Sequence, residues 1–228
     1  AIFKQIFGES PYKSPTDMGV NMAGNCIIDD EACKEASRQE IIRRYFKALS
    51  GIMEGTKTEE EAFKIELLMK QETIDPDNRS TVAPALLRAK ETGAPAVALE
   101  LPDGQIITGK TSTLLGPSAA VLLNAIKELA GIKHEEKIIS PLAIEPIQRL
   151  KVQYLRSRNP RLHTDEVLIA LSATAANNLD ASKALSMLPK LKGCQVHSSV
   201  LLTDVDKRTF AKLGIDVTCE AVSPLNEE

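Results

Sequence analysis

Residues 104–111 have the sequence GQIITGKT, in which a glycine, four further residues and Gly-Lys-Thr follow the spacing of a Walker A loop. In such a loop, backbone N–H groups surround the phosphates of a nucleotide and the lysine contacts them. The intervening Gln-Ile-Ile-Thr favours extended structure instead, and the next helix is expected only near Pro117. The Pro-Asp-Gly sequence at 102–104 predicts a β-hairpin between strands over residues 95–101 and 105–110. The hairpin is the favoured interpretation, and no nucleotide loop is expected in this part of the protein.

A polar loop near the N-terminus is the first candidate binding site. Residues 8–25 hold a lysine, hydroxyls, a carboxylate and amides, between glycines that allow close approach of the backbone. This set suits a phosphorylated or polar ligand, with Asp17 as a candidate catalytic carboxylate. The alternative is a linker whose polar side chains cap its own turns. The candidate ligand-binding residues of this loop are Lys13, Ser14, Thr16 and Asn21.

Two further groups of polar residues lie next to predicted helix starts. Arg161 could hold an anion near the N-terminus of a helix that Thr164 is expected to cap. His163 titrates near neutral pH and is the candidate general acid or base. Lys110 and Thr111, at the end of the second hairpin strand, could hold an anion even without a Walker A loop. The alternatives are a solvated loop with a capped helix and a strand end on the surface.

The cysteines give no sign of a metal site. The four cysteines form no CxxC pair, and their spacing fits no zinc ribbon or finger. Cys194 and His197 are close in sequence but lie in a predicted strand, where side chains three positions apart point to opposite faces. We therefore expect no zinc, and the sequence identifies no cofactor.

The chain up to residue 92 is interpreted as a helical subdomain. Gly51 is expected to end its first helix, and Thr58 opens the second with a capping box to Glu61. The predicted helices cover residues 30–49, 58–69 and 80–90.

Residues 93–228 alternate strands with helices, which predicts a three-layer α/β/α sandwich with a mixed sheet. The fold class is α/β, or α+β when the helical subdomain is included. Beyond the hairpin, strands are predicted over residues 137–140, 194–202 and 216–222.

The order of strand, Asp-Gly turn, strand, Thr-Gly, loop and helix resembles the opening layout of cytidine-deaminase-like folds. Zinc deaminases place His or Cys together with Glu at the head of the following helix, and Pro-Cys-x-x-Cys later. The helix predicted here opens with Gly-Pro-Ser-Ala-Ala at residues 116–120 and lacks them. A cytidine-deaminase-like layout without zinc residues is therefore expected.

The composition limits the classes of partner. Of the 228 residues, 43% are apolar, and 28 Lys and Arg against 31 Asp and Glu leave a net charge of −3. A chain balanced in this way has no bulk attraction to nucleic acid or to an anionic membrane. The longest apolar runs are about five residues, whereas a membrane-spanning helix needs about 20. We expect a cytoplasmic protein with neither nucleic acid nor a membrane as its partner.

Several stretches resemble a bacterial family of uncharacterised conserved proteins, carried as a domain of unknown function. The longest is SPYKSPTDMGVNMAGNCIIDDEACKEASRQEIIRRYF at residues 10–46. The stretches ELPDGQIITGKTS, GPSAAVLLNAIKELAGI, ISPLAIEPIQRLK and NPRLHTDEVLIALS continue the match. The resemblance implies that full members are about twice this length and that this chain is their C-terminal half. Residues 1–7, which look like the end of a helix without its beginning, agree with that expectation.

The missing N-terminal half is then an expected partner, and the resemblance implies that it carries its own glycine-rich loop. Self-association into a homo-oligomer is a second expectation. The expected function is a contribution to a cleft for a phosphorylated or nucleotide-like small molecule. The alternative is a non-catalytic docking and oligomerisation module for the missing half. The sequence leaves open whether the protein is an enzyme.

Overall fold

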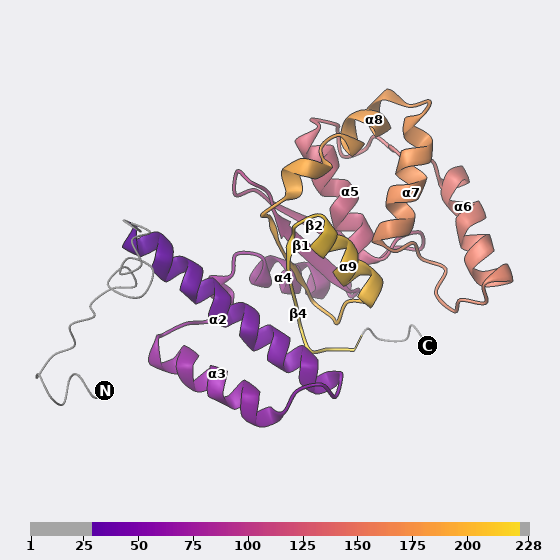
Figure 1. Ribbon diagram of the computed structural model, residues 1–228. Coiled ribbons are helices and arrows are strands. Elements are labelled where there is room, and N and C mark those ends of the chain that lie inside the picture. The colour runs from indigo at the N-terminus through magenta and orange to yellow at the C-terminus, as the bar shows by residue number, and fades with distance from the viewer. Residues whose placement is uncertain (1–28, 224–228) are drawn as a thin grey trace, which may run out of the picture.

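The computed structural model describes residues 29–223 of the chain (Figure 1). It opens with two helices, α2 (Asp30–Met53) and α3 (Glu59–Gln71), which a short 3₁₀ turn, η2 (Pro76–Asn78), joins to α4 (Val82–Thr92). The first two helices and the start of α4 share a small apolar core. The buried members of this core are Ile42, Phe46, Met69 and Val82.

The ends of α2 and α3 show one sequence prediction that is confirmed and one that is wrong. Thr58 opens α3 with a capping box, in which Glu61 accepts a hydrogen bond from the N–H of Thr58. Gly51 does not end α2, which continues to Met53. A Cβ at Gly51 would lie 2.3 Å from Cγ of Lys57. A glycine is therefore needed at position 51 because the chain that follows α2 folds back closely against it. Gly51 does not end the helix.

Four strands form one mixed sheet in the order β2-β1-β3-β4. The predicted hairpin is confirmed: β1 (Ala96–Glu100) pairs antiparallel with β2 (Ile106–Lys110). Its turn places Gly104 at φ +85°, a conformation that glycine adopts at little cost. The sheet continues from β1 through β3 (Gln195–Ser198), which is antiparallel to it, to β4 (Asp216–Cys219), which is parallel to β3.

The prediction of a strand over residues 137–140 is wrong. That segment is a loop within which Ile138 and Ile139 are buried in the main core. The apolar run in this segment indicates burial and not strand pairing. A short apolar run has no periodicity that distinguishes a strand from another buried segment. The strands expected over 194–202 and 216–222 form but are shorter.

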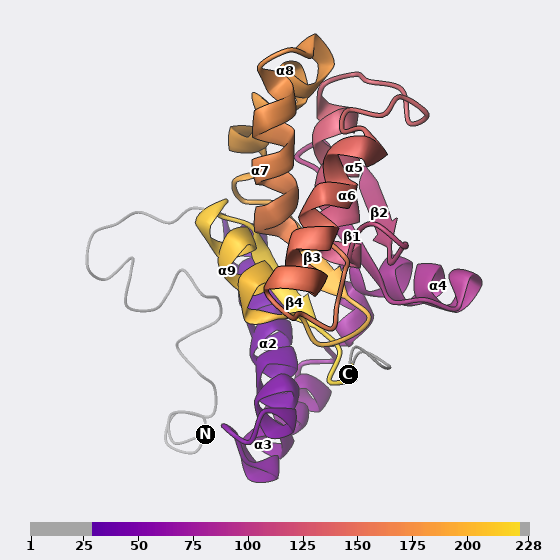
Figure 2. The same cartoon turned by 90° about the vertical axis from the view of Figure 1, so that its right-hand side faces the viewer.

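Helices cover both faces of the sheet, as a three-layer α/β sandwich requires. On one face, Val97, Leu99 and Val196 share the main core with α5 (Pro117–Leu129) and α9 (Asp204–Lys212). On the other face, α2 and α4 contact the strands, and Figure 2 shows α4 and α9 on opposite sides of the sheet. The fold is thus α/β, whereas the cytidine-deaminase-like layout is not confirmed.

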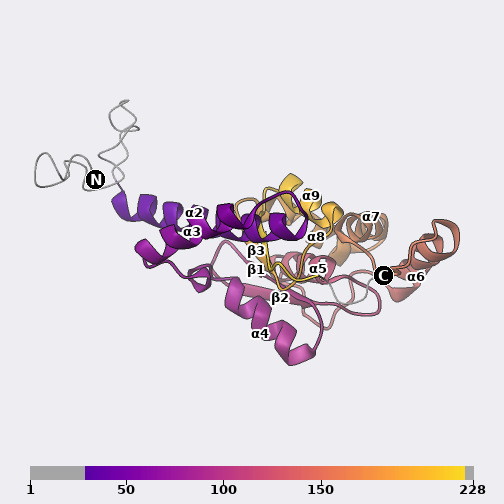
Figure 3. The ribbon, with the colours of Figure 1, turned by 90° about the horizontal axis from the view of Figure 1, so that it is seen from below.

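The remaining helices extend the main-core side of the molecule. They are α6 (Pro141–Arg149), which runs into a π turn at Leu150–Tyr154, then α7 (Thr164–Ala175), α8 (Leu179–Leu185) and the 3₁₀ turn η4 (Leu188–Leu191). The pair α2–α3 and helix α6 lie at opposite ends of the molecule (Figures 1 and 3). Helix α4 packs on β1, β2 and β3, and the boundary expected at residue 92 stays a prediction.

A buried histidine joins the helical part to the sheet. The ring of His197 in β3 packs against the ring of Phe46 in α2, with 4.7 Å between centroids. Its Nδ1 lies 2.8 Å from Oγ1 of Thr218, and its Nε2 lies 3.1 Å from a carboxylate oxygen of Glu220. Burial lowers the pKa of His197, although the nearby Glu220 carboxylate acts in the opposite direction.

We expect the fold to lose stability as the pH falls because of His197. The unfolded chain takes up the proton first, so stability that is present above about pH 6.5 is lost as the pH falls toward the folded pKa. Urea unfolding at about pH 7.5 and about pH 5.5 measures this loss, which should be smaller in His197→Asn than in the wild type. His134→Asn, at an exposed position, is the control. Equal losses in all three proteins would contradict the assignment.

Candidate functional site

Two of the predicted groups of polar residues meet at one edge of the sheet. Strands β2 and β3 are both antiparallel to β1, so their carboxyl ends lie at the same edge. In open α/β sheets, ligands bind outside the carboxyl ends of strands. Here the loops after the two strands enclose a small pocket of about 30 Å³, which we call the helix-terminus pocket. The polar side chains that line it belong to Thr111, Ser118, Asn159, Arg161, His163, Thr203 and Asp206.

A backbone bridge brings the two groups together. Leu115 and Leu162 form an isolated parallel bridge, and the N–H of Gly116 donates to the carbonyl of Leu162 at 3.1 Å. The bridge holds the segment before α5 beside the segment before α7. Residues that are some fifty positions apart in sequence, Thr111 and Arg161, therefore line the same pocket.

The N-terminus of α5 points into the pocket without a side-chain cap. Its N-cap residue is Gly116 and its first residue is Pro117, and no side chain within residues 29–223 caps the first turn. The Ser118 side chain is 1% exposed, and its hydroxyl oxygen has no hydrogen-bond partner among the described residues. A helix N-terminus carries a partial positive charge and free N–H donors. This end of α5 is suited to bind an anion.

His163 and Asp206 form a hydrogen-bonded pair at the wall of the pocket. Nδ1 of His163 lies 3.3 Å from one carboxylate oxygen of Asp206, which also accepts from the hydroxyl of Thr203 at 2.9 Å. The second oxygen accepts from the N–H of Thr164 at 3.0 Å. Both oxygens of this buried carboxylate thus accept hydrogen bonds. The carboxylate lies at the N-terminal ends of α7 and α9, where the helix dipoles favour a negative charge.

The pair shifts both pKa values. The hydrogen bond to Asp206 raises the pKa of His163 above its ordinary value and outweighs the opposing effect of burial. Burial alone would raise the pKa of Asp206, but the hydrogen bonds from His163, the N–H of Thr164 and Thr203 outweigh it and hold that pKa low. The favoured state is an imidazolium beside a carboxylate.

The start of α7 is capped differently from the expectation. Thr164 is the first residue of the helix and His163 is the N-cap residue, so the prediction that Thr164 caps it is wrong. The N–H of Thr164 is satisfied by Asp206 of α9, and the N–H of His163 by Glu166 at 2.8 Å. Buried Lys151 donates to the same Glu166 oxygen at 2.7 Å and to the carbonyl of Arg161 at 2.6 Å. These contacts fix the backbone from Arg161 to Glu166.

The structure places the other predicted residues as follows. Nε of Arg161 donates to the carbonyl of Ser112 at 2.9 Å, and the Thr111 hydroxyl donates to the carbonyl of Pro95 at 3.1 Å. Lys110 is exposed at the end of β2 and does not line the helix-terminus pocket. Five predicted residues lie outside the described part of the chain: Lys13, Ser14, Thr16, Asp17 and Asn21.

Ser118, His163 and Asp206 line one pocket, but they do not form an assembled nucleophilic triad. Such a triad needs the hydroxyl within hydrogen-bonding distance of the histidine, and the Ser118 oxygen has no partner among the described residues. Within residues 29–223, no group of three or more His, Cys, Asp and Glu side chains is placed to hold a metal ion. The pocket offers hydrogen-bond donors, a cation and a titratable imidazole.

The fold and this pocket define an α/β protein with a polar pocket at the carboxyl edge of its sheet. The chain belongs to the family of the domain of unknown function DUF1846. The model of the C-terminal domain of that family matches residues 77–226, and the model of its N-terminal domain matches residues 1–73. The resemblance inferred from the sequence is thereby confirmed.

Curated relatives come from several bacteria and are uncharacterised. The UPF0371 protein of Streptococcus thermophilus is 55% identical over 217 residues, which cover 95% of this chain and 44% of the relative. A UPF0371 protein of Corynebacterium glutamicum is 54% identical over 219 residues, which again cover 44% of its length. This chain therefore spans less than half the length of the relatives. Within its described residues, no helix is both long enough and apolar enough to cross a bilayer.

Proposed function

We propose that the helix-terminus pocket binds the phosphate end of a small phosphorylated molecule in the cytoplasm. The observation that carries the proposal is the buried, unpartnered hydroxyl of Ser118 at the uncapped start of α5, beside Arg161 and His163. An oxyanion accepts hydrogen bonds from such a hydroxyl and from free helix N–H groups. The free thiols of Cys33, Cys194 and Cys219 suit a reducing compartment.

The charges around the pocket support an anion over a cation. Asp206 is the one carboxylate among the described side chains that line it, and both its oxygens are engaged by His163, Thr164 and Thr203. The imidazolium of His163 and the guanidinium of Arg161 are the positive groups of the lining. A volume of about 30 Å³ is roughly two to three times the minimum that a single water molecule needs, which suits one small polyatomic group. We therefore assign only the phosphate end of the ligand to the pocket, with the remainder outside it.

Arg161→Ala and Ser118→Ala should weaken binding of phosphorylated metabolites. Loss of a hydrogen bond to a charged group costs about 1.5–3 kcal/mol, which corresponds to roughly 10- to 150-fold in affinity. Isothermal titration measures the affinities, and thermal melts check the fold. Arg158→Ala removes an exposed arginine of the same loop that does not line the pocket and is the matched control. Equal affinities and melting points for Arg161→Ala and the wild type would contradict this role and show that Arg161 is only a solvated loop residue.

Anion binding should also weaken as the pH rises through the raised pKa of His163. Deprotonation removes the imidazolium charge, and the other charged side chains that act on this ring belong to Asp206, Lys151 and Glu166. Sulfate is the suitable probe because its charge is constant from about pH 6 to about pH 9, the window in which histidine titrates. His163→Gln should bind sulfate more weakly at the acid end and show no pH dependence in this window. A wild-type affinity that does not change with pH would contradict the role of His163.

A docking module for the missing half of the protein, or for a second copy, is the second candidate function. Helix α6 and the π turn after it expose large apolar side chains at the end of the molecule opposite α3 (Figure 3). These side chains are Leu142, Leu150, Val152, Tyr154 and Leu155. Light scattering of wild type and Leu142→Glu tests whether this surface mediates self-association. A dimer that the substitution converts to a monomer would favour self-association through this surface.

A further inference from the structure

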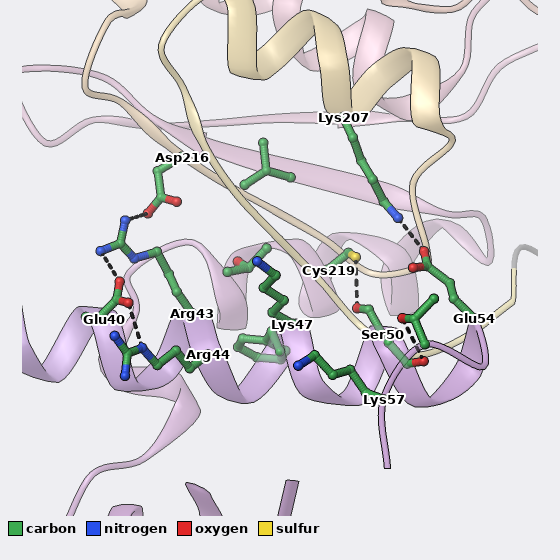
Figure 4. Close-up of a pocket in the computed structure, with 15 residues that line it drawn as sticks. Glu40, Arg43, Arg44, Lys47, Ser50, Glu54, Lys57, Lys207, Asp216 and Cys219 are labelled. Atoms are coloured by element: carbon green, nitrogen blue, oxygen red, sulfur yellow. Dashed lines mark hydrogen bonds and ion pairs between the residues drawn. The ribbon is translucent and has the colours of Figure 1, made fainter. Parts of the chain in front are cut away.

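We propose that a second site, separate from the helix-terminus pocket, binds a small molecule with at least two negative charges between α2 and β4. A cleft of about 660 Å³ lies here, within the range of about 300–1,000 Å³ for small-molecule sites. Its walls are the second half of α2, the loop after it, strand β4 and helix α9 (Figure 4). We call it the α2–β4 cleft.

The cleft carries an excess of positive charge in a chain whose net charge is −3. Five cationic side chains line it against three carboxylates, a surplus of two positive charges. The cations are Arg43, Arg44, Lys47, Lys57 and Lys207, and the carboxylates are Glu40, Glu54 and Asp216. A ligand with two negative charges balances this surplus.

Ion pairs occupy the two ends of the cleft and leave its centre open. At one end, Arg43 bridges Glu40 and Asp216, and at the other end, Lys207 pairs with Glu54. Figure 4 shows Lys47 between these two pairs, extending from α2 toward β4. Lys47 forms no ion pair with any described residue, and Lys57 pairs with Glu61 outside the cleft. One unbalanced charge is therefore that of Lys47 at the centre. The other lies at the arginine end, where Arg43 and Arg44 share Glu40 and the buried Arg79 also pairs with Asp216.

The strand side of the cleft adds backbone donors. Strand β4 is at the edge of the sheet, and all four of its residues line the cleft. The N–H groups of Asp216 and Glu220 donate toward β3, so the alternating Val217 and Cys219 direct theirs away from β3. These N–H groups and the Lys47 ammonium are the donors for an anionic ligand.

A small molecule suits this edge better than an added peptide strand. Strand β4 has four residues, and its end is already in contact with α2, where Sγ of Cys219 lies 3.4 Å from Oγ of Ser50. Strand addition needs a longer free edge on which main-chain hydrogen bonds repeat. Val217, which is half-buried, also lines the cleft and offers apolar surface to the uncharged part of the ligand.

Titration with inorganic pyrophosphate at constant pH tests the proposal. Lys47→Ala should weaken binding about tenfold, the effect of one lost hydrogen bond to a charged group, and binding should weaken further as salt is added. Lys47 is exposed, so melting should not change. Lys70→Ala removes an exposed lysine of α3 that does not line the cleft and should bind as the wild type does.

Ser118→Ala separates this proposal from the first, because it alters only the helix-terminus pocket. In Ser118→Ala, the pyrophosphate affinity of the α2–β4 cleft should be unchanged, whereas that of the helix-terminus pocket should fall. An affinity of Lys47→Ala equal to that of the wild type would overturn the proposal, whether pyrophosphate binds elsewhere or not at all. A loss confined to Ser118→Ala would place the anion in the helix-terminus pocket alone and would also overturn the second site.

Discussion

Gly109→Ala is expected to lower the free energy of unfolding by about 3 kcal/mol or more, the upper range for overpacking a core. Gly109 is the second glycine of GQIITGKT and lies in β2, directly against α5. A Cβ at this position would lie 2.2 Å from the backbone nitrogen of Val121 and 2.8 Å from the backbone carbon of Ala120. Both contacts are with the main chain of a helix, which cannot rotate away as a side chain can. The strand and helix would have to separate.

Gly104→Ala is the matched control, because Gly104 is the first glycine of the same stretch. It has φ +85°, and a Cβ added there would meet no atom within 4 Å, so only backbone strain of about 1–2 kcal/mol is expected. Urea unfolding of the two variants and the wild type measures the difference. If Gly109→Ala were no more destabilising than Gly104→Ala, the close packing of β2 on α5 would be refuted.

Arg79→Ala is expected to destabilise the fold by about 3–5 kcal/mol, the cost of breaking a buried ion pair. The Arg79 side chain is 0% exposed and joins the segment before α4 to the sheet. Its guanidinium donates to the carboxylate of Asp216 at 3.0 Å, to the carbonyl of the same residue at 3.0 Å and to the carbonyl of Val196 at 3.3 Å. Removal leaves the buried carbonyl of Val196 without this donor and takes two hydrogen bonds from the half-buried Asp216.

Arg43→Ala provides the control for Arg79, because Arg43 contacts the same Asp216 carboxylate at 3.5 Å with a side chain that is 40% exposed. Exposed pairs contribute about 0–1 kcal/mol, so a small change is expected. Chemical unfolding of both variants decides the matter. Similar small losses would show that the buried guanidinium is not needed to hold the helical part on the sheet.

The parts of the fold that were predictable from sequence are those specified by neighbouring residues. The hairpin depends on Pro-Asp-Gly and adjacent β-branched residues, and the start of α3 depends on Thr58 and Glu61, three positions apart. The errors have tertiary causes. Gly51 is required by the return of Lys57 against α2, and the first N–H of α7 is satisfied by Asp206, 42 positions from Thr164.

The candidate site was predictable only in part for the same reason. Arg161, His163 and Thr111 carry chemistry that is visible in the sequence, and the structure places all three at the helix-terminus pocket. Ser118 gave no such signal, because a serine in the first turn of a helix is common and only burial without a partner distinguishes it. Asp206 could have been suspected only by knowing that the start of α9 lies beside the start of α7.

A crystal structure of this protein grown with tungstate would show directly whether an oxyanion binds at the start of α5. Tungstate has the charge and tetrahedral shape of a phosphate group, and its anomalous scattering locates it without ambiguity. We expect an anomalous peak within hydrogen-bonding distance of the Ser118 hydroxyl, with Arg161 and His163 beside it. The peak should be lost in the double variant that combines Ser118→Ala with Arg161→Ala. Peaks elsewhere on the protein, with none at the start of α5, would contradict this expectation.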